Sequence, residues 1–114
     1  MGFKEVHNLD TRINESKKII FKYPGRIPVI VEKSNSCELP DISKKKYLVP
    51  TDLTMSQFIY IIRKRIEIDA SKSLFIMVND HLVPSAKSMG IIYEDDKDED
   101  GFLYMTYTSE NTFG

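Results

Sequence analysis

Few residues of this chain have the types and spacing that chemistry requires. The acidic run 96–101 copies the start of a calcium-binding loop, but position twelve of that loop, where a bidentate glutamate belongs, is Tyr107. The histidines, His7 and His81, have no cysteine or carboxylate at ligand spacing, and Cys37 has no local base signal. We therefore expect a solvated acidic turn, no metal site and no catalytic site.

The end of the chain is the remaining chemical feature. Thr108 to Thr112 favour irregular backbone, and the sequence stops at Gly114. Without a Cβ, glycine enters slots too narrow for a side chain, so another protein's active site could activate and transfer its carboxylate. We interpret 108–114 as a flexible tail that extends up to ~23 Å from the body. Considered alone, the glycine is better explained as a frayed terminus.

Composition limits the class of protein. The 114 residues are 41% hydrophobic and 29% charged, which suits one domain that needs no disulfide or metal. The net charge of -1 gives no general affinity for nucleic acid. A single cysteine is typical of a reducing compartment, and no apolar run is long enough to cross a bilayer. We expect a soluble, cytoplasmic chain.

Hydrophobic periodicity predicts helices and strands in an α+β order. Asp10 is the expected cap of a helix that runs to Tyr23, after a short helical turn at 3–6. Strands are expected at 27–31, 44–49, 74–78 and 102–107, with the last strand central because both of its faces are apolar. Pro28 prefers a strand's start or edge. Asn79 and Asp80 form a turn, and 88–94 is a short helix.

The clearest helix begins at Thr54. Thr54 and Gln57 have the spacing of a capping box, and Leu53 and Phe58 that of a hydrophobic staple. Its buried stripe is Met55, Phe58, Ile59, Ile62 and Ile66.

Lysine and arginine gather in three groups: Lys17, Lys18 and Lys22; Lys44, Lys45 and Lys46; Arg63, Lys64 and Arg65. Such groups are either solvated faces that protect a sheet edge, or surfaces for acidic partners.

Several segments resemble the lipid-conjugated ubiquitin-like modifiers of autophagy, the family that includes GABARAP. They are Arg26 to Ile30, Lys44 to Pro50, Asp52 to Thr54, Gln57-Phe58, Ile62 to Ile66, Phe75 to Asp80, Lys97 to Tyr104 and Glu110 to Gly114. The resemblance covers nearly the whole chain in one register. It implies one ubiquitin-like β-grasp domain over 1–114, with a mixed four-stranded sheet and an N-terminal helical extension at 1–24.

The resemblance also implies the chemistry of the tail. Gly114 would be the lipid-attachment residue, joined to the amine of phosphatidylethanolamine by an adenylating enzyme and thioester-carrying cysteine enzymes. A cysteine protease would process or deconjugate the chain, and a sequence ending at Gly114 would need no prior cleavage. The chain itself would be no enzyme and need no cofactor. Lipidation would move it from the cytoplasm to autophagosomal or vacuolar membranes.

Members of this family bind aromatic-x-x-aliphatic peptides as an added strand at the sheet edge, beside two apolar pockets. Carried over, the first pocket is Glu15, Ile19, Pro28, Ile30, Lys46, Leu48 and Phe102. The second is Tyr47, Val49, Pro50, Leu53, Phe58 and Ile61. Lys44, Lys45 and Arg65 would attract acidic residues of the peptide. Without the resemblance, the apolar members are better explained as ordinary core.

Two other classes of function remain open. The chain could be an unconjugated protein-interaction or RNA-binding module that uses its basic surfaces with Tyr47 and Tyr60, although the balanced charge argues against nucleic acid. An enzyme that uses Cys37 is the third class.

Overall fold

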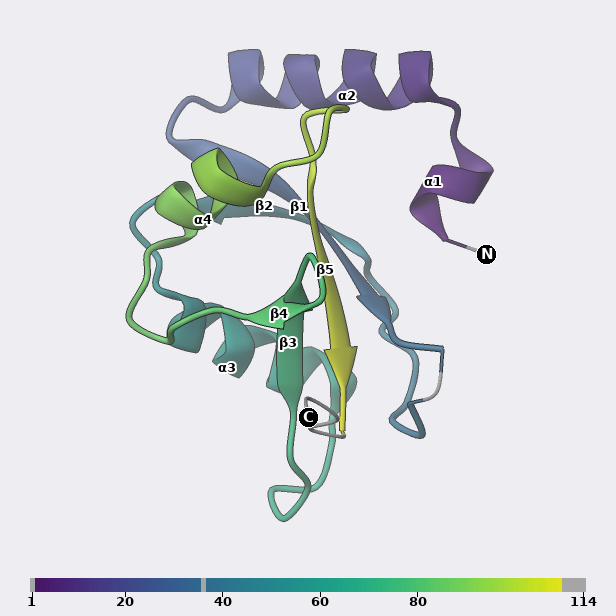
Figure 1. Ribbon diagram of the computed structural model, residues 1–114, viewed down its shortest axis with the longest axis vertical. Helices are drawn as coiled ribbons and strands as arrows, with labels where there is room; N and C mark the ends of the chain where they lie inside the picture. Colours follow the sequence, from purple (N-terminus) through teal and green to yellow (C-terminus); the bar gives the residue numbers. More distant parts are fainter. Residues whose placement is uncertain (1, 36, 110–114) are drawn as a thin grey trace.

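The computed structural model describes residues 2–35 and 37–109, and Gly114 with most of the predicted tail lies outside them. Nine elements follow one another along the described chain (Figure 1). They are α1 (Phe3–Val6), α2 (Leu9–Lys22), β1 (Arg26–Lys33), β2 (Lys46–Pro50), α3 (Met55–Ile66), β3 (Phe75–Val78), β4 (His81–Leu82), α4 (Met89–Asp96) and β5 (Leu103–Thr108).

The strands form one mixed sheet in the order β2-β1-β5-β3-β4. The last strand, β5, lies in the middle, parallel to β1 and antiparallel to β3. The prediction of a central C-terminal strand, made from its apolar faces, is therefore confirmed. The α+β class is also confirmed.

The expectation of four strands was wrong, because the sheet has five. Asn79 and Asp80 both adopt positive φ, 50° and 63°, which is the backbone of a tight two-residue hairpin turn. The turn brings Leu82 opposite Met77, so a second strand follows it. The sequence indicated the turn alone, because β4 is two exposed residues long and has no apolar alternation.

Most predicted boundaries shift by one or two residues, with β2 beginning at Lys46 instead of Lys44 and including Pro50. Two of the shifts have a clear local cause or consequence. The N-cap of α2 is Asn8, whose side-chain oxygen accepts the N–H of Thr11 at 2.8 Å, so the helix begins before the predicted cap at Asp10. β5 continues through Thr108, which is buried although the sequence placed it in the tail. The capping box of α3 forms as predicted, with the Thr54 N–H bound to Gln57 Oε1 at 2.9 Å.

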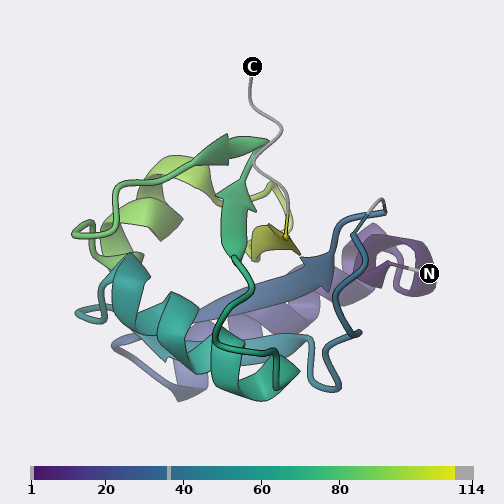
Figure 2. The ribbon, with the colours of Figure 1, turned by 90° about the horizontal axis from the view of Figure 1, so that it is seen from below.

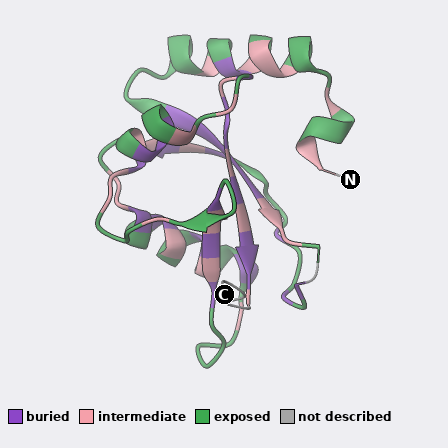
Figure 3. Cartoon of the chain, viewed as in Figure 1, coloured by how far each residue is buried: buried purple, intermediate pink, exposed green. Residues whose placement is uncertain are grey.

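The sheet is covered on both faces. α3 and α4 pack the main core against one face of the sheet, which includes Val29, Leu103 and Met105. The other face carries Ile30 and Phe102, both fully buried, under the N-terminal helices. Seen from below, α4 and α1 stand on opposite sides of β5 (Figure 2), and buried positions run along the central strands (Figure 3).

The acidic turn before β5 is solvated at Lys97 and Glu99, but contrary to expectation one of its carboxylates is buried. Asp100 is only 1% exposed. Its carboxylate accepts bonds from Arg12 at 2.6 Å, from the Tyr104 hydroxyl at 2.5 Å and from the Phe102 N–H at 2.8 Å. Burial and the bond to Asp100 hold the pKa of Tyr104 well above its usual value. The turn thereby attaches α2 to the sheet.

No helix within residues 2–35 and 37–109 has the length and apolar character needed to span a membrane.

Candidate functional site

The edge of the sheet at β2 is open, since β2 pairs with β1 on one side only. The Val31 N–H donates to the Lys45 carbonyl at 2.8 Å, so Val31 and Lys45 are a hydrogen-bonded pair. In an antiparallel ladder, hydrogen-bonded pairs alternate with pairs that are not bonded. The register then makes Val29 with Tyr47 a bonded pair. The backbone groups of Lys46 and Leu48 consequently point outward, where an added strand would pair with them.

Pro28 lies opposite Leu48, at a pair that is not bonded across β1 and β2. It precedes Val29, where pairing with β5 begins, so its missing N–H costs the sheet no ladder bond. This is why β1 begins at Arg26 despite the proline.

Arg26 also touches this edge, and sequence reasoning missed it as a site residue. Its guanidinium donates to the outward carbonyl of Leu48 at 3.2 Å. Arg26 precedes Pro28 by two residues, so the side chains of these two residues lie on the same face of the sheet. Only the register between β1 and β2 shows which carbonyl Arg26 reaches.

The first predicted group gathers on the face of the sheet that α2 covers. Glu15 of α2 forms an ion pair with Lys46 of β2, across the top of the group. Ile30 and Phe102 are fully buried and form its floor, and Leu48 remains half-buried. Pro28 is buried and Ile19 half-buried. An incoming side chain would therefore meet Leu48 and the Glu15–Lys46 pair before it reached the floor.

The second group lies on the opposite face, between β2 and α3. Tyr47, Val49 and Phe58 are buried, with the rings of Tyr47 and Phe58 edge to face at 5.9 Å. Leu53 is half-buried and Ile61 is exposed, so these form its outer wall. Pro50 is half-buried, but it follows Leu48 by two residues, so strand alternation assigns it to the face of the first group. Half of the second group, namely Tyr47, Val49 and Phe58, is also core, as the alternative interpretation held.

The Tyr47 hydroxyl finds no hydrogen-bond partner among the described residues. Burial raises the pKa of Tyr47, and the nearby charge of Arg65 opposes that rise. The ring is too buried to stack on a nucleic-acid base, which removes one support for the RNA-binding alternative.

The three predicted cations do not share one place. The Lys44 ammonium lies 5.2 Å from the ring centre of Tyr47, and Arg65 acts on the same hydroxyl. Lys45 instead faces Glu32, with 3.8 Å between the ammonium and the carboxylate. Lys44 and Arg65 therefore flank the second group, whereas Lys45 belongs to another part of the surface.

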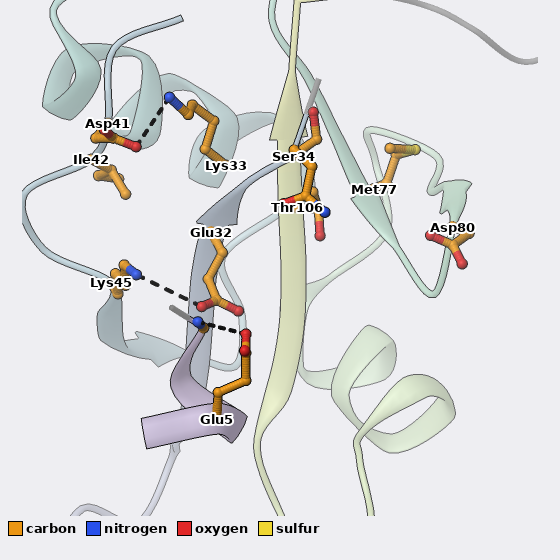
Figure 4. A pocket seen from close by; sticks show the side chains of 12 residues that line it. Glu5, Glu32, Lys33, Ser34, Asp41, Ile42, Lys45, Met77, Asp80 and Thr106 are labelled. Atoms are coloured by element: carbon orange, nitrogen blue, oxygen red, sulfur yellow. Dashed lines mark hydrogen bonds and ion pairs between the residues drawn. The ribbon is translucent and has the colours of Figure 1, made fainter. Parts of the chain in front are cut away.

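That other part holds a depression of about 820 Å³, shown in Figure 4. A cross-strand row of Glu32, Thr106 and Met77 forms its base, beside α1. Glu32 already accepts the Phe3 N–H at 2.8 Å, and Lys33 pairs with Asp41 at 3.1 Å. The depression contains no member of either predicted pocket, and each of its two lysines, Lys33 and Lys45, faces a carboxylate.

Within the described ranges, no three His, Cys, Asp or Glu side chains gather closely enough to hold a metal ion. Cys37 is buried, and its sulfur accepts the N–H of Leu39 at 3.3 Å.

An open edge strand with one side-chain group on either face is the arrangement that the resemblance implied. A family model described as "Autophagy protein Atg8 ubiquitin like" matches residues 11–114. The chain belongs to the Atg8 family.

The sequences of individual Atg8 relatives are similar to this chain over nearly its full length. Autophagy-related protein 8a of Arabidopsis thaliana is 58% identical over 113 residues, covering 99% of this chain and 93% of the relative. Autophagy-related protein 8B of Oryza sativa subsp. indica is 57% identical, covering 99% and 95%.

Among solved structures, that of Trypanosoma brucei ATG8 superposes with a TM-score of 0.92 at 40% identity. The match covers 100% of this chain and 98% of that one. The Atg8 family identity makes the chain an autophagy protein with a ubiquitin-like fold.

Proposed function

We propose that the chain is a ubiquitin-like modifier that is conjugated through Gly114 to phosphatidylethanolamine. On autophagic membranes it acts as an adaptor that recruits proteins with aromatic-x-x-aliphatic motifs for autophagosome formation and cargo selection. The chain performs no catalysis itself. Adenylating and thioester-carrying enzymes load it, and a cysteine protease releases it. It moves between the cytoplasm and autophagosomal or vacuolar membranes.

The observation that carries the adaptor role is the outward direction of the Lys46 and Leu48 backbone groups. An extended peptide pairing there would place alternate side chains on the two faces of the sheet. One face offers Leu48 above Ile30 and Phe102, and the other offers Leu53 and Ile61 beside Tyr47. Lys44 and Arg65 would add attraction for acidic flanking residues, each exposed pair contributing about 0.2–1 kcal/mol.

Conjugation is tested by mass spectrometry after reaction with the conjugation enzymes, ATP and liposomes of phosphatidylethanolamine. The expected result is the mass of one amide-linked lipid on the full chain, and none on a variant that lacks Gly114. A lipid adduct on the truncated variant would contradict attachment at this residue.

Peptide binding is tested by calorimetry with an acidic peptide that contains an aromatic-x-x-leucine core. Leu48→Ala should weaken binding about three- to tenfold, because covering a leucine that is already half-buried contributes about half of the 1.5–3 kcal/mol of full burial. Leu82→Ala is the matched control, since Leu82 lies on the opposite edge strand and is 44% exposed. Equal loss in both variants would refute binding at β2.

A further inference from the structure

The outer side of α2 displays an apolar side chain that the adaptor function does not use. Phe21 is 90% exposed, more than any other large hydrophobic residue of the described chain. Ser16 of the same helix is buried against the turn before β5, and Phe21 follows it by five positions, on the opposite side. The helix lies across one end of the molecule with its exposed positions directed away from the sheet (Figure 3).

Lysines surround this phenylalanine. Lys17 and Lys18 precede it by four and three residues, which places them one helical turn away on the same surface, and Lys22 follows it. All three are exposed, and none forms an ion pair with a described residue. We call Lys17, Lys18, Phe21 and Lys22 the α2 outer face.

The carboxylates of α2 do not neutralise this face. Glu15 is engaged by Lys46 of β2. Asp10 belongs to the first turn, about 10 Å along the helix axis from Lys17. The α2 outer face is therefore cationic, although the whole chain has a net charge of -1.

We propose that the α2 outer face binds directly to a bilayer surface that contains anionic phospholipid. Phe21 enters the boundary between headgroups and acyl chains, and the three lysines remain with the phosphates. Each lysine near such a surface strengthens binding about fivefold, so the contact is reversible and depends on salt.

The geometry favours a bilayer over an acidic protein. A stable protein interface buries about 800 Å² on each partner around an apolar core of several residues. The α2 outer face has one protruding ring on an outward-facing helix, and neither main depression of the described surface includes it. A bilayer accepts a single protruding ring because its surface deforms around it.

This contact needs no conjugation, so it stands or fails separately from the proposed lipid attachment. The end of β5, from which the chain continues toward Gly114, lies at the opposite end of the molecule from α2 (Figure 1).

The test uses the full, unconjugated chain and vesicles of phosphatidylcholine with or without phosphatidylserine. The natural sequence has no tryptophan, so Phe21→Trp creates a single fluorescent reporter. On anionic vesicles its emission should shift to shorter wavelength and be quenched by brominated acyl chains. Ile91→Trp is the matched control, because Ile91 is 54% exposed on α4 beside Glu94 and Asp95. It should show neither change.

Sedimentation of the same vesicles measures affinity. Phe21→Ser and the double variant Lys17→Glu/Lys18→Glu should each reduce binding at least about fivefold. Lys64→Glu, a charge reversal on α3, should leave it unchanged. Undiminished binding by either α2 variant, equal binding to pure phosphatidylcholine, or binding to polyglutamate without vesicle binding would overturn the proposal.

Discussion

The guanidinium of Arg26 donates a hydrogen bond to the backbone carbonyl of Leu48 at 3.2 Å. This carbonyl faces the open edge of the sheet, so an added strand must compete with Arg26 for it. Arg26→Ala should tighten binding of the aromatic-x-x-leucine peptide about two- to tenfold, the range of one hydrogen bond. Calorimetry measures the change.

Arg65→Ala provides the contrast to that prediction. Arg65 lies near Tyr47 and has no such bond to the edge, so its loss should weaken binding of an acidic peptide about two- to fivefold. If both arginine variants weaken binding, Arg26 contributes charge instead of covering the carbonyl.

Tyr47→Phe should stabilise the protein by about 1 kcal/mol, because it removes a buried hydroxyl without a partner in the described chain. The ring contact with Phe58 would be retained. In Tyr107→Phe the lost hydroxyl donates to the Pro40 carbonyl at 2.6 Å, so that variant should lose about 1 kcal/mol. Urea unfolding measures both, and a destabilised Tyr47→Phe would indicate an ordered water on the hydroxyl.

Gly101→Ala should destabilise the fold more than Gly25→Ala. Both glycines have positive φ, 90° and 87°, where a Cβ costs about 1 kcal/mol. A Cβ on Gly101 would also lie 2.4 Å from Ser16 Oγ, whereas one on Gly25 meets nothing within 4 Å. Gly25→Ala should therefore cost about 1 kcal/mol and Gly101→Ala about 1–3 kcal/mol more.

Urea unfolding at constant m-value provides both free energies, and equal costs would contradict the close approach of Ser16 to the turn. Ser16→Ala removes the nearest atom and should recover part of the loss in the double variant.

Acid should weaken the attachment of α1. Burial tends to raise the pKa of Asp98, but hydrogen bonds from Lys4 and from the Asp100 N–H outweigh it, so the pKa of Asp98 is lowered. The Lys4–Asp98 pair, 2.5 Å apart, therefore contributes stability above the ordinary carboxyl pKa of about 4 and loses it as pH falls through the lowered value.

NMR should show the amide resonances of Phe3 and Lys4 shifting in this acid range. Asp98→Asn should remove that titration while leaving the Phe3 N–H bound to Glu32. An unchanged titration in this variant would contradict the contribution of the Lys4–Asp98 pair.

The sequence by itself determined the local elements and the family of this protein. The capping box at Thr54 and Gln57, the turn at Asn79 and Asp80, and the double-faced apolar pattern of β5 all involve residues close together in the chain. Such signals are readable because hydrogen bonds and periodicity over a few residues depend on nearby side chains alone. The apolar pattern of β5 was therefore sufficient to predict a central C-terminal strand.

Only the tertiary structure decided which side chains meet. The partner of Asp100 is Arg12, 88 residues away, and no local pattern distinguishes that buried carboxylate from its solvated acidic neighbours. The direction of the Leu48 carbonyl likewise depends on the register between β1 and β2. Contacts between residues far apart in the chain depend on how whole helices and strands pack together. The sequence therefore indicates the candidate site residues, and the tertiary structure decides which of them line the floor of a group, its wall or the open sheet edge.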